Sequence, residues 1–411
     1  MRMCGIAGKG AGAVVATALS WGVVTGCASV TGGADVAAGP MPKDVPPLMR
    51  TFSGDEVKDL AGWQRRRAEL KEKFLTEEYG KRPDGADRPA VLRFEVAEPD
   101  RTMMDGKAVR KRIRCVYGGK YGVTNFVFTA FIPKAAKPSP AFLLICNRKP
   151  DDNIDPERVK KSEFWPAEEL VDRGYAALAF WNGDVTPDMR WDFDHGVFGV
   201  FQRPQDRDAE SWGVLSAWAW GASRVMDWIE TEPTLDAKHV GVVGHSRGGK
   251  TALLAGVTDE RFAMVCSNCS GCSGAKLNHI DLPKSEHINV ICDVLGFWFC
   301  GNYAKYKFRD EEMDFDQHQW LALVAPRLLA VASATEDAWA GQEGEFHAAR
   351  LASPAWELYG KKGLVGETFP GADRPLQEGS VSYHERTGIH NLTSYDWNRY
   401  MDFADRHGWR R

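Results

Sequence analysis

The 411-residue sequence lacks several features that would place it in a specialised class of protein. The formal net charge is only −4 and no basic stripe is present, so nucleic acid is not an expected partner. No internal repeats are found. The apolar run from Ala11 to Val24 is too short to span a membrane as a helix. The remaining composition is ordinary for a globular protein, and the length suits one large α/β domain with insertions.

The cysteines do not complete a metal site. Three of them, at positions 266, 269 and 272, are spaced like metal ligands, but no His or Cys cluster supplies the rest of a tetrahedral site, so we expect no metal. The seven cysteines after Cys27 are an odd number, which in an exported protein means at least one free thiol. We also expect a disulfide from one of the three to Cys292 or Cys300. The seven are Cys115, Cys146, Cys266, Cys269, Cys272, Cys292 and Cys300.

The first 27 residues are typical of an export signal. Arg2 and Lys9 supply positive charge, an apolar stretch follows, and residues 24–27 (VTGC) resemble a bacterial lipobox. We expect residues 1–27 to be a lipoprotein-type signal with a lipid anchor at Cys27; ordinary cleavage after Ala28 is the alternative. Residues 28–48, rich in Gly, Ala and Pro, predict a flexible linker, and residues 49–411 the folded domain. The expected location is the bacterial periplasm or the outer membrane, as an anchored lipoprotein.

The folded domain alternates strand-like and helical segments, with turn-rich insertions over 182–208 and 268–306. This alternation predicts a mostly parallel, twisted sheet with helices on both faces. Strands are predicted at 90–98, 111–117, 124–132, 141–146, 175–181, 239–243, 263–267 and 328–332, and helices at 53–78, 168–174, 212–229, 354–360 and 394–407.

The most informative stretch is residues 239–256, HVGVVGHSRGGKTALLAG. It places G-x-S-x-G between an apolar strand and a helix, which is the nucleophile elbow of the α/β-hydrolases. We therefore expect an α/β-hydrolase fold, a three-layer α-β-α sandwich, with Ser246 as nucleophile. The backbone N–H of Arg247 is the expected oxyanion donor, and the loop 147–150 should supply a second donor.

A serine nucleophile needs a histidine base and a carboxylate that orients it, and in this fold they follow the serine in the order acid, then histidine. His390 lies after a glycine turn and before the last helix, where the base is expected. His384 and His407 are the alternatives. Asp337 follows the strand at 328–332 and is the expected acid, with its neighbour Glu336 as the alternative.

Several motifs together resemble the glucuronoyl esterases of carbohydrate esterase family fifteen. The resemblance implies cleavage of esters between 4-O-methyl-glucuronic acid of xylan and lignin alcohols. We expect a monomer that needs no metal or organic cofactor. The resemblance implies that Ser246 is the nucleophile, His390 the base and Arg247 an oxyanion residue. It also implies that Lys250 binds glucuronate hydroxyls and that Trp339 contacts the sugar. The motifs are residues 212–224 (WGVLSAWAWGASR), 244–250 (GHSRGGK), 267–272 (SNCSGC), 325–327 (APR), 336–340 (EDAWA) and 386–390 (RTGIH).

The chain departs from the family pattern at one position that bears on the chemistry. Many members carry the triad acid as Glu where this sequence has Cys269, and some resemble this chain in using an acid at the later strand end, where Asp337 stands. The loop 147–150 also differs from the family pattern. Two other functions therefore stay open: an acetyl xylan esterase on the same fold, and a non-catalytic surface protein that binds polysaccharide.

Overall fold

The computed structural model describes residue 42, residues 44–190 and residues 192–410. The chain divides into two units, residues 1–34 and 35–411, and every described residue belongs to the second. The predicted signal at 1–27 and most of the predicted linker lie outside the described residues. The end of that linker was predicted incorrectly. Leu48 is buried in the domain, and the carbonyl of Pro46 accepts a hydrogen bond from Nε2 of His318 at 3.0 Å. These residues are ordered because burial of an apolar side chain and a backbone hydrogen bond attach them to the domain.

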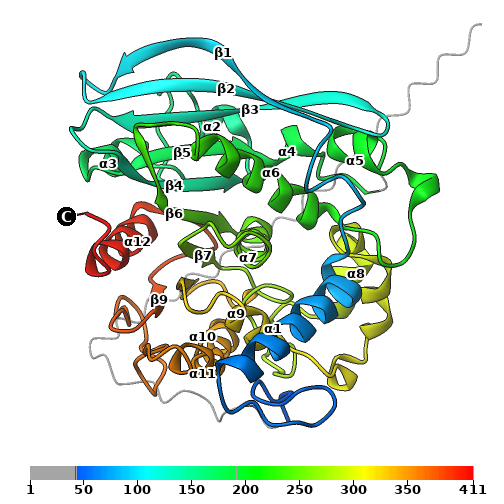
Figure 1. Cartoon of the computed structure of the whole chain (residues 1–411). Coiled ribbons are helices and arrows are strands. Elements are labelled where there is room, and N and C mark those ends of the chain that lie inside the picture. The colour runs from blue at the N-terminus through cyan, green and yellow to red at the C-terminus, as the bar shows by residue number, and fades with distance from the viewer. Residues whose placement is uncertain (1–41, 43, 191, 411) are drawn as a thin grey trace, which may run out of the picture. The chain divides into compact units, whose positions relative to one another are not determined.

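The described residues form one sheet of nine strands in the order β1-β2-β3-β5-β4-β6-β7-β8-β9 (Figure 1). The first three strands pair antiparallel, β3 pairs antiparallel with β5, and all pairs from β5 to β9 are parallel. The strands are β1 (Val91–Met103), β2 (Ala108–Gly119), β3 (Gly122–Pro133), β4 (Ser139–Cys146), β5 (Ala176–Trp181), β6 (Leu235–His245), β7 (Met264–Asn268), β8 (Leu328–Ala334) and β9 (Val381–Arg386).

Helices cover both faces of the sheet, which confirms the predicted three-layer α/β-hydrolase architecture (Figure 1). Side chains alternate along each central strand: in β4, Leu143 and Ile145 join one buried core, whereas Phe142 and Leu144 join the other. Helices α6 and α7 pack in the first core, and α3 and α12 in the second. The helices are α1 (Leu60–Phe74), α2 (Pro150–Asn153), α3 (Ala167–Asp172), α4 (Asn182–Val185), α5 (Gly196–Phe201), α6 (Val214–Ile229), α7 (Arg247–Thr258), α8 (Ile288–Leu295), α9 (Gln317–Ala322), α10 (Gln342–Ala352), α11 (Pro354–Glu357) and α12 (Ser394–Arg406).

Several boundaries differ from the sequence predictions for local reasons. Helix α1 begins at Leu60 rather than near Ser53, because the Asp59 side chain caps it by accepting from the Gly62 N–H at 2.7 Å. The segment 182–208 is not a plain loop, since it folds into the short helices α4 and α5. Helix α10 and strand β9 were not predicted. Single π and 3₁₀ turns complete the described elements at Leu75–Tyr79, Pro204–Asp206, Gly296–Trp298, Gly301–Tyr306 and Asp310–Glu312.

All seven cysteines of the described region are free thiols, so the prediction of a disulfide to Cys292 or Cys300 is wrong and that of a free thiol is confirmed. Buried thiols here bond to oxygen acceptors instead: Cys300 Sγ lies 3.4 Å from the Thr76 carbonyl oxygen.

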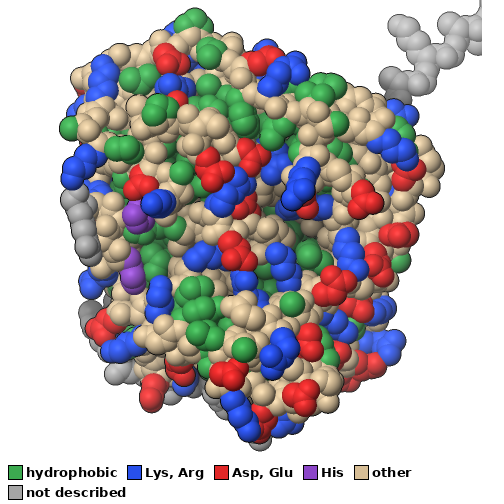
Figure 2. Space-filling model, in the orientation of Figure 1, with side chains coloured by type: hydrophobic (Ala, Val, Ile, Leu, Met, Phe, Trp, Pro, Cys, Tyr) green, Lys and Arg blue, Asp and Glu red, His purple; other side chains and the backbone are tan. Residues whose placement is uncertain are grey.

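On the face shown in Figure 2, basic and acidic side chains are interspersed and form no continuous basic stripe, in keeping with the small net charge. Within the described ranges, no helix has both the length and the apolar character that a membrane crossing requires.

Candidate active site

Ser246 lies at the strained turn between β6 and α7. Its backbone has φ 57° and ψ −126°, a conformation that a non-glycine residue rarely adopts and that costs about 1–3 kcal/mol. Gly244 allows the turn, because a Cβ at this position would stand 1.9 Å from the carbonyl oxygen of Gly248. The turn places Ser246 at the N-terminus of α7, where the first backbone N–H groups lack intrahelical acceptors. The N–H of Arg247 is the first of them.

The Arg247 side chain ties the elbow to two neighbouring loops. Its Nη2 donates to the carbonyl oxygen of Asn147 at 3.0 Å, and its Nε forms an ion pair with Asp188 Oδ2 at 2.7 Å. The other carboxylate oxygen of Asp188 accepts from the indole N–H of Trp298 at 2.7 Å. The guanidinium therefore fixes the loop after β4, which was expected to hold the second oxyanion donor. Asp188 and Trp298 were not identified from the sequence, since both lie inside insertions without periodicity.

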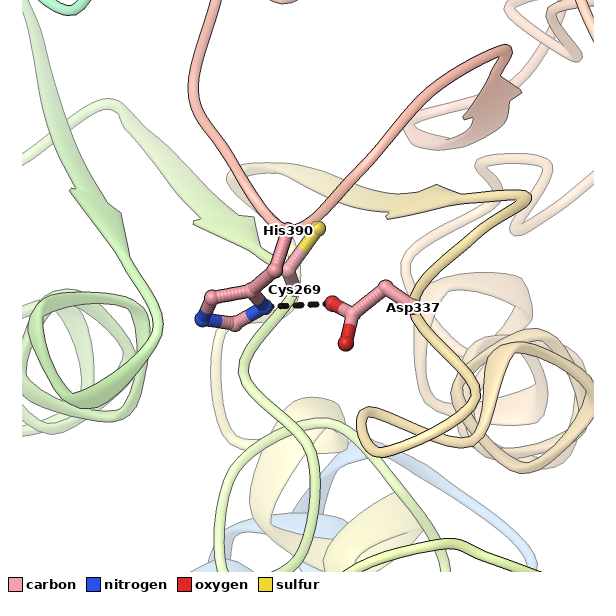
Figure 3. Close-up of side chains that lie close together, drawn as sticks. All are labelled: Cys269, Asp337 and His390. Atoms are coloured by element: carbon pink, nitrogen blue, oxygen red, sulfur yellow. Dashed lines mark hydrogen bonds and ion pairs between the residues drawn. The ribbon is translucent and has the colours of Figure 1, made fainter. Parts of the chain in front are cut away.

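His390 and Asp337 form a close pair at the carboxyl ends of the last strands (Figure 3). Nδ1 of His390 lies 2.5 Å from Oδ2 of Asp337. A carboxylate only accepts hydrogen bonds, so Nδ1 carries the proton and Nε2 keeps the lone pair that a general base needs. Asp337 is 4% exposed, whereas Glu336 is exposed and does not occupy this position.

The other two candidate histidines have different partners. His384 is buried in β9, and its Nε2 lies 2.9 Å from Asp396 Oδ1 in α12. This contact holds together the two ends of the segment that carries His390. His407 is exposed after α12 and donates from Nδ1 to the carbonyl of Phe403 at 2.9 Å.

A second histidine, His245, connects the elbow to His390. The two ring centroids are 4.3 Å apart. Nδ1 of His245 lies 2.6 Å from Oδ1 of Asn268 at the end of β7, and the Ser246 N–H donates to the Asn268 carbonyl at 2.8 Å. Burial, with the neighbouring His390 as the second cause, holds the pKa of His245 well below its ordinary value. The neutral ring of His245 therefore packs beside the ring of His390. His245 occupies the variable position before Ser246 in the elbow motif, so the motif did not predict this contact.

Lys250 is buried one turn into α7, so the alternative of a solvated lysine is wrong. Its Nζ donates to the carbonyl of Ser270 at 2.5 Å and pairs with Glu286 at 2.9 Å. The Glu286 N–H in turn donates to the Trp339 carbonyl at 2.8 Å, and the Trp339 side chain is 48% exposed. The structure therefore links Lys250 and Trp339 through Glu286, which lies in the long insertion and was not identified from the sequence.

Cys269 follows β7 at the position where the resemblance places a glutamate. Its backbone φ is 46°, and its thiol lies beside the His390–Asp337 pair (Figure 3). Burial raises the pKa of this thiol well above its usual range, and the charges of Glu345 and Asp337 add to the effect. A neutral thiol cannot take the place of the carboxylate.

A buried carboxylate, Glu345 of α10, holds the loop that carries Cys269. One of its oxygens accepts from the N–H groups of Ser270 at 2.8 Å and Gly271 at 3.0 Å, and the other accepts from the Ser333 hydroxyl at 2.6 Å. Burial raises the pKa of Glu345 to about 7. Glu345 lies 75 residues from Ser270 in sequence, and no local pattern signals the contact.

A serine on a strand–helix elbow, with a His–Asp pair at neighbouring strand ends, defines a serine-type α/β-hydrolase. A family model for "Glucuronyl esterase, fungi" matches residues 168–360. Carbohydrate esterase MZ0003, from an unknown prokaryotic organism, is 32% identical over 393 residues, which cover 88% of this chain and 89% of that protein.

Solved structures agree with these relatives. A glucuronoyl esterase from Solibacter usitatus is 35% identical with a TM-score of 0.81, over 88% of this chain and 97% of that one. A glucuronoyl esterase from Teredinibacter turnerae is 26% identical with a TM-score of 0.80, over 89% of each chain. The chain belongs to the glucuronoyl esterases of carbohydrate esterase family 15.

Proposed function

We propose that this protein hydrolyses esters of (4-O-methyl-)glucuronic acid in xylan, including those that join xylan to lignin alcohols, through an acyl-enzyme on Ser246. Membership of the glucuronoyl esterase family supports the substrate class. The contact of 2.5 Å between His390 Nδ1 and Asp337 Oδ2, beside the elbow, is the observation that carries the mechanism.

In the first half-reaction, the Ser246 hydroxyl attacks the ester carbonyl while Nε2 of His390 takes its proton. The negative charge that develops on the carbonyl oxygen is stabilised by the N–H of Arg247 at the start of α7. Asp337 keeps the proton on Nδ1 and stabilises the imidazolium. The intermediate then collapses, and His390 donates its proton to the leaving alcohol. Water repeats the sequence on the acyl-enzyme and releases glucuronate and Ser246.

Lys250 and Trp339 are the proposed sugar contacts. Two of the three ammonium donors of Lys250 are directed to Ser270 and Glu286, which leaves one for a substrate oxygen. The half-exposed indole of Trp339 offers an apolar face for a pyranose ring. Both belong to the cluster joined through Glu286, so this cluster is where we place the glucuronate moiety.

We also propose that the protein is exported and lipid-anchored at Cys27. The charged start, the apolar stretch and the VTGC sequence at 24–27 support this proposal. Metabolic labelling with a fatty acid should give a labelled protein for the native chain and an unlabelled one for Cys27→Ser. Equal labelling of both would contradict the proposal.

The function is tested by comparing benzyl glucuronate with acetylated xylan as substrates. We expect a higher kcat/KM for the glucuronate ester, and a loss of kcat of about a millionfold in Ser246→Ala. A fluorophosphonate should label the native protein but not this variant. Preference for acetylated xylan would favour an acetyl esterase, and absence of labelling would favour a non-catalytic protein.

The substrate site is tested separately with Lys250→Gln. Loss of this donor should raise KM for the glucuronate ester by about tenfold or more, while KM for an acetate ester that lacks the glucuronate moiety changes little. An equal rise for both substrates would indicate general disruption instead of a lost sugar contact.

A further inference from the structure

Three different metal-ligating groups meet beside the proposed catalytic base. The Cys269 sulfur, a carboxylate oxygen of Asp337 and a ring nitrogen of His390 all lie within 4.8 Å of one another (Figure 3). They come from three separate strand ends, after β7, β8 and β9. Thiolate, imidazole and carboxylate are the three ligand types that Zn²⁺ takes in proteins. The residues at 266 and 272, which shared the spacing with Cys269 in the sequence, do not belong to this group in the described region.

The position of Cys269 is fixed by its backbone. Its N–H donates to the Ala332 carbonyl at 2.7 Å, and the next two N–H groups are held by Glu345. The side chain packs with the methyl groups of Ala334 and Ala340, which supply no polar partner. Within the described residues the Cys269 sulfur makes no hydrogen bond, in contrast to the bonded thiols of Cys146, Cys272 and Cys300.

The group is accessible from one side. The His390 side chain is 39% exposed, whereas the Asp337 side chain is only 3% exposed and Cys269 is buried. An ion in solution therefore meets the imidazole first and the two buried ligands behind it. Movements of about 1 Å would bring three such atoms to the separations found around a zinc ion with bonds of about 2.0–2.3 Å.

We propose that Cys269, Asp337 and His390 form an inhibitory site for a soft divalent cation of the Zn²⁺ or Cd²⁺ type. The Cys269 thiol gives up its proton to solvent and the sulfur bonds to the metal. Asp337 exchanges its hydrogen bond for a metal–oxygen bond. The metal replaces the proton on Nδ1 of His390, and the neutral imidazole then carries its proton on Nε2. Water completes the coordination.

This exchange of tautomer explains why the bound metal inhibits. The base needs a lone pair on Nε2 to accept the Ser246 proton, and in the metal-bound form that position is protonated. The metal is thus a reversible inhibitor and takes no part in ester hydrolysis. The coordination itself does not depend on the proposed function, although the loss of activity does.

The site is tested by titrating the native protein with CdCl₂ and following the thiolate-to-cadmium charge-transfer absorption, which needs no esterase activity. We expect one equivalent of cadmium to bind through Cys269, with the signal lost in both Cys269→Ala and Cys269→Ser. Cys292→Ala is the matched control, since Cys292 is the most exposed of the free thiols in the described region and should leave the signal unchanged. An undiminished signal in both Cys269 variants would overturn the proposal.

The inhibition is tested in parallel with ZnCl₂ on hydrolysis of benzyl glucuronate. Native protein and Cys292→Ala should be inhibited by zinc and should recover with EDTA. In Cys269→Ala and Cys269→Ser the inhibition constant for zinc should rise at least about tenfold, with the activity of each variant measured relative to its own rate without zinc. Cadmium binding without inhibition would contradict the tautomer exchange. Absence of activity in the native protein without metal would instead count against the proposed function.

Discussion

Two loops that leave neighbouring strands face the same histidine with different chemistry. The loop after β7 presents Cys269 and the loop after β8 presents Asp337, and both lie beside His390 (Figure 3). Only Asp337 bonds to Nδ1, at 2.5 Å. The buried Cys269 thiol is neutral, because burial raises its pKa. Because both strands end at one edge of the parallel sheet, the two loops come close to the same histidine, and only the loop that carries a carboxylate bonds to it.

The largest expected effect is the loss of the Asp337 carboxylate. Asp337→Ala should lower kcat by about ten-thousandfold, because His390 loses both its preferred tautomer and the partner of its cation. Steady-state kinetics on benzyl glucuronate measure the change. Cys269→Ala is the matched control at the neighbouring strand end and should lower kcat far less. Similar losses in the two variants would mean that the thiol also supports the base.

A smaller effect is expected from moving the acid to the other loop. In the Asp337→Ala background, Cys269→Glu should restore about a hundredfold in kcat, because a carboxylate at this strand end also reaches His390. Cys269→Gln in the same background is the isosteric control without charge. If kcat of the Cys269→Glu variant does not exceed kcat of the Cys269→Gln variant, the loop after β7 does not have the geometry that places an acid beside His390.

The smallest effect concerns how the loop after β7 is held. Burial raises the pKa of Glu345 in the folded state to about 7, whereas a glutamate in the unfolded chain has a pKa of about 4.3. As the pH rises, the unfolded chain therefore loses this proton before the folded protein does. The free energy of unfolding should therefore fall by about 2 kcal/mol between about pH 5 and about pH 7 through this residue alone.

Denaturant unfolding across this pH range measures the contribution of Glu345. Glu345→Gln should remove that part of the slope, whereas Glu357→Gln, at an exposed position of α11, should leave the slope unchanged. An unchanged slope in Glu345→Gln would show that the carboxylate does not hold a proton in the folded state.

Local features of the sequence predicted the parts of the structure that depend on local geometry. The elbow is one such case, because a Cβ at Gly244 would meet the backbone only four residues further along the chain. The parallel sheet is another, since apolar strands alternate with helices. Asp337 and His390 were selected from their order after Ser246, and the structure places them in contact.

The features that the sequence did not reveal depend on contacts between distant segments. Glu286 partners Lys250 from 36 residues away, and Glu345 holds Ser270 from 75 residues away, so neither leaves a periodic signal. The expected disulfide was wrong for a related reason: cysteine spacing carries no information about whether two thiols meet in a folded core.

The most direct test of the central claim is the proton NMR spectrum of the His390 Nδ1–H in the native protein, Cys269→Ala and Asp337→Ala. A histidine N–H bonded to a carboxylate gives a resonance far downfield of the amide region. If Asp337 orients the base, the resonance is present in the native protein and in Cys269→Ala and is lost in Asp337→Ala. Its persistence in Asp337→Ala, or its loss in Cys269→Ala, would contradict the assignment of the acid to the loop after β8.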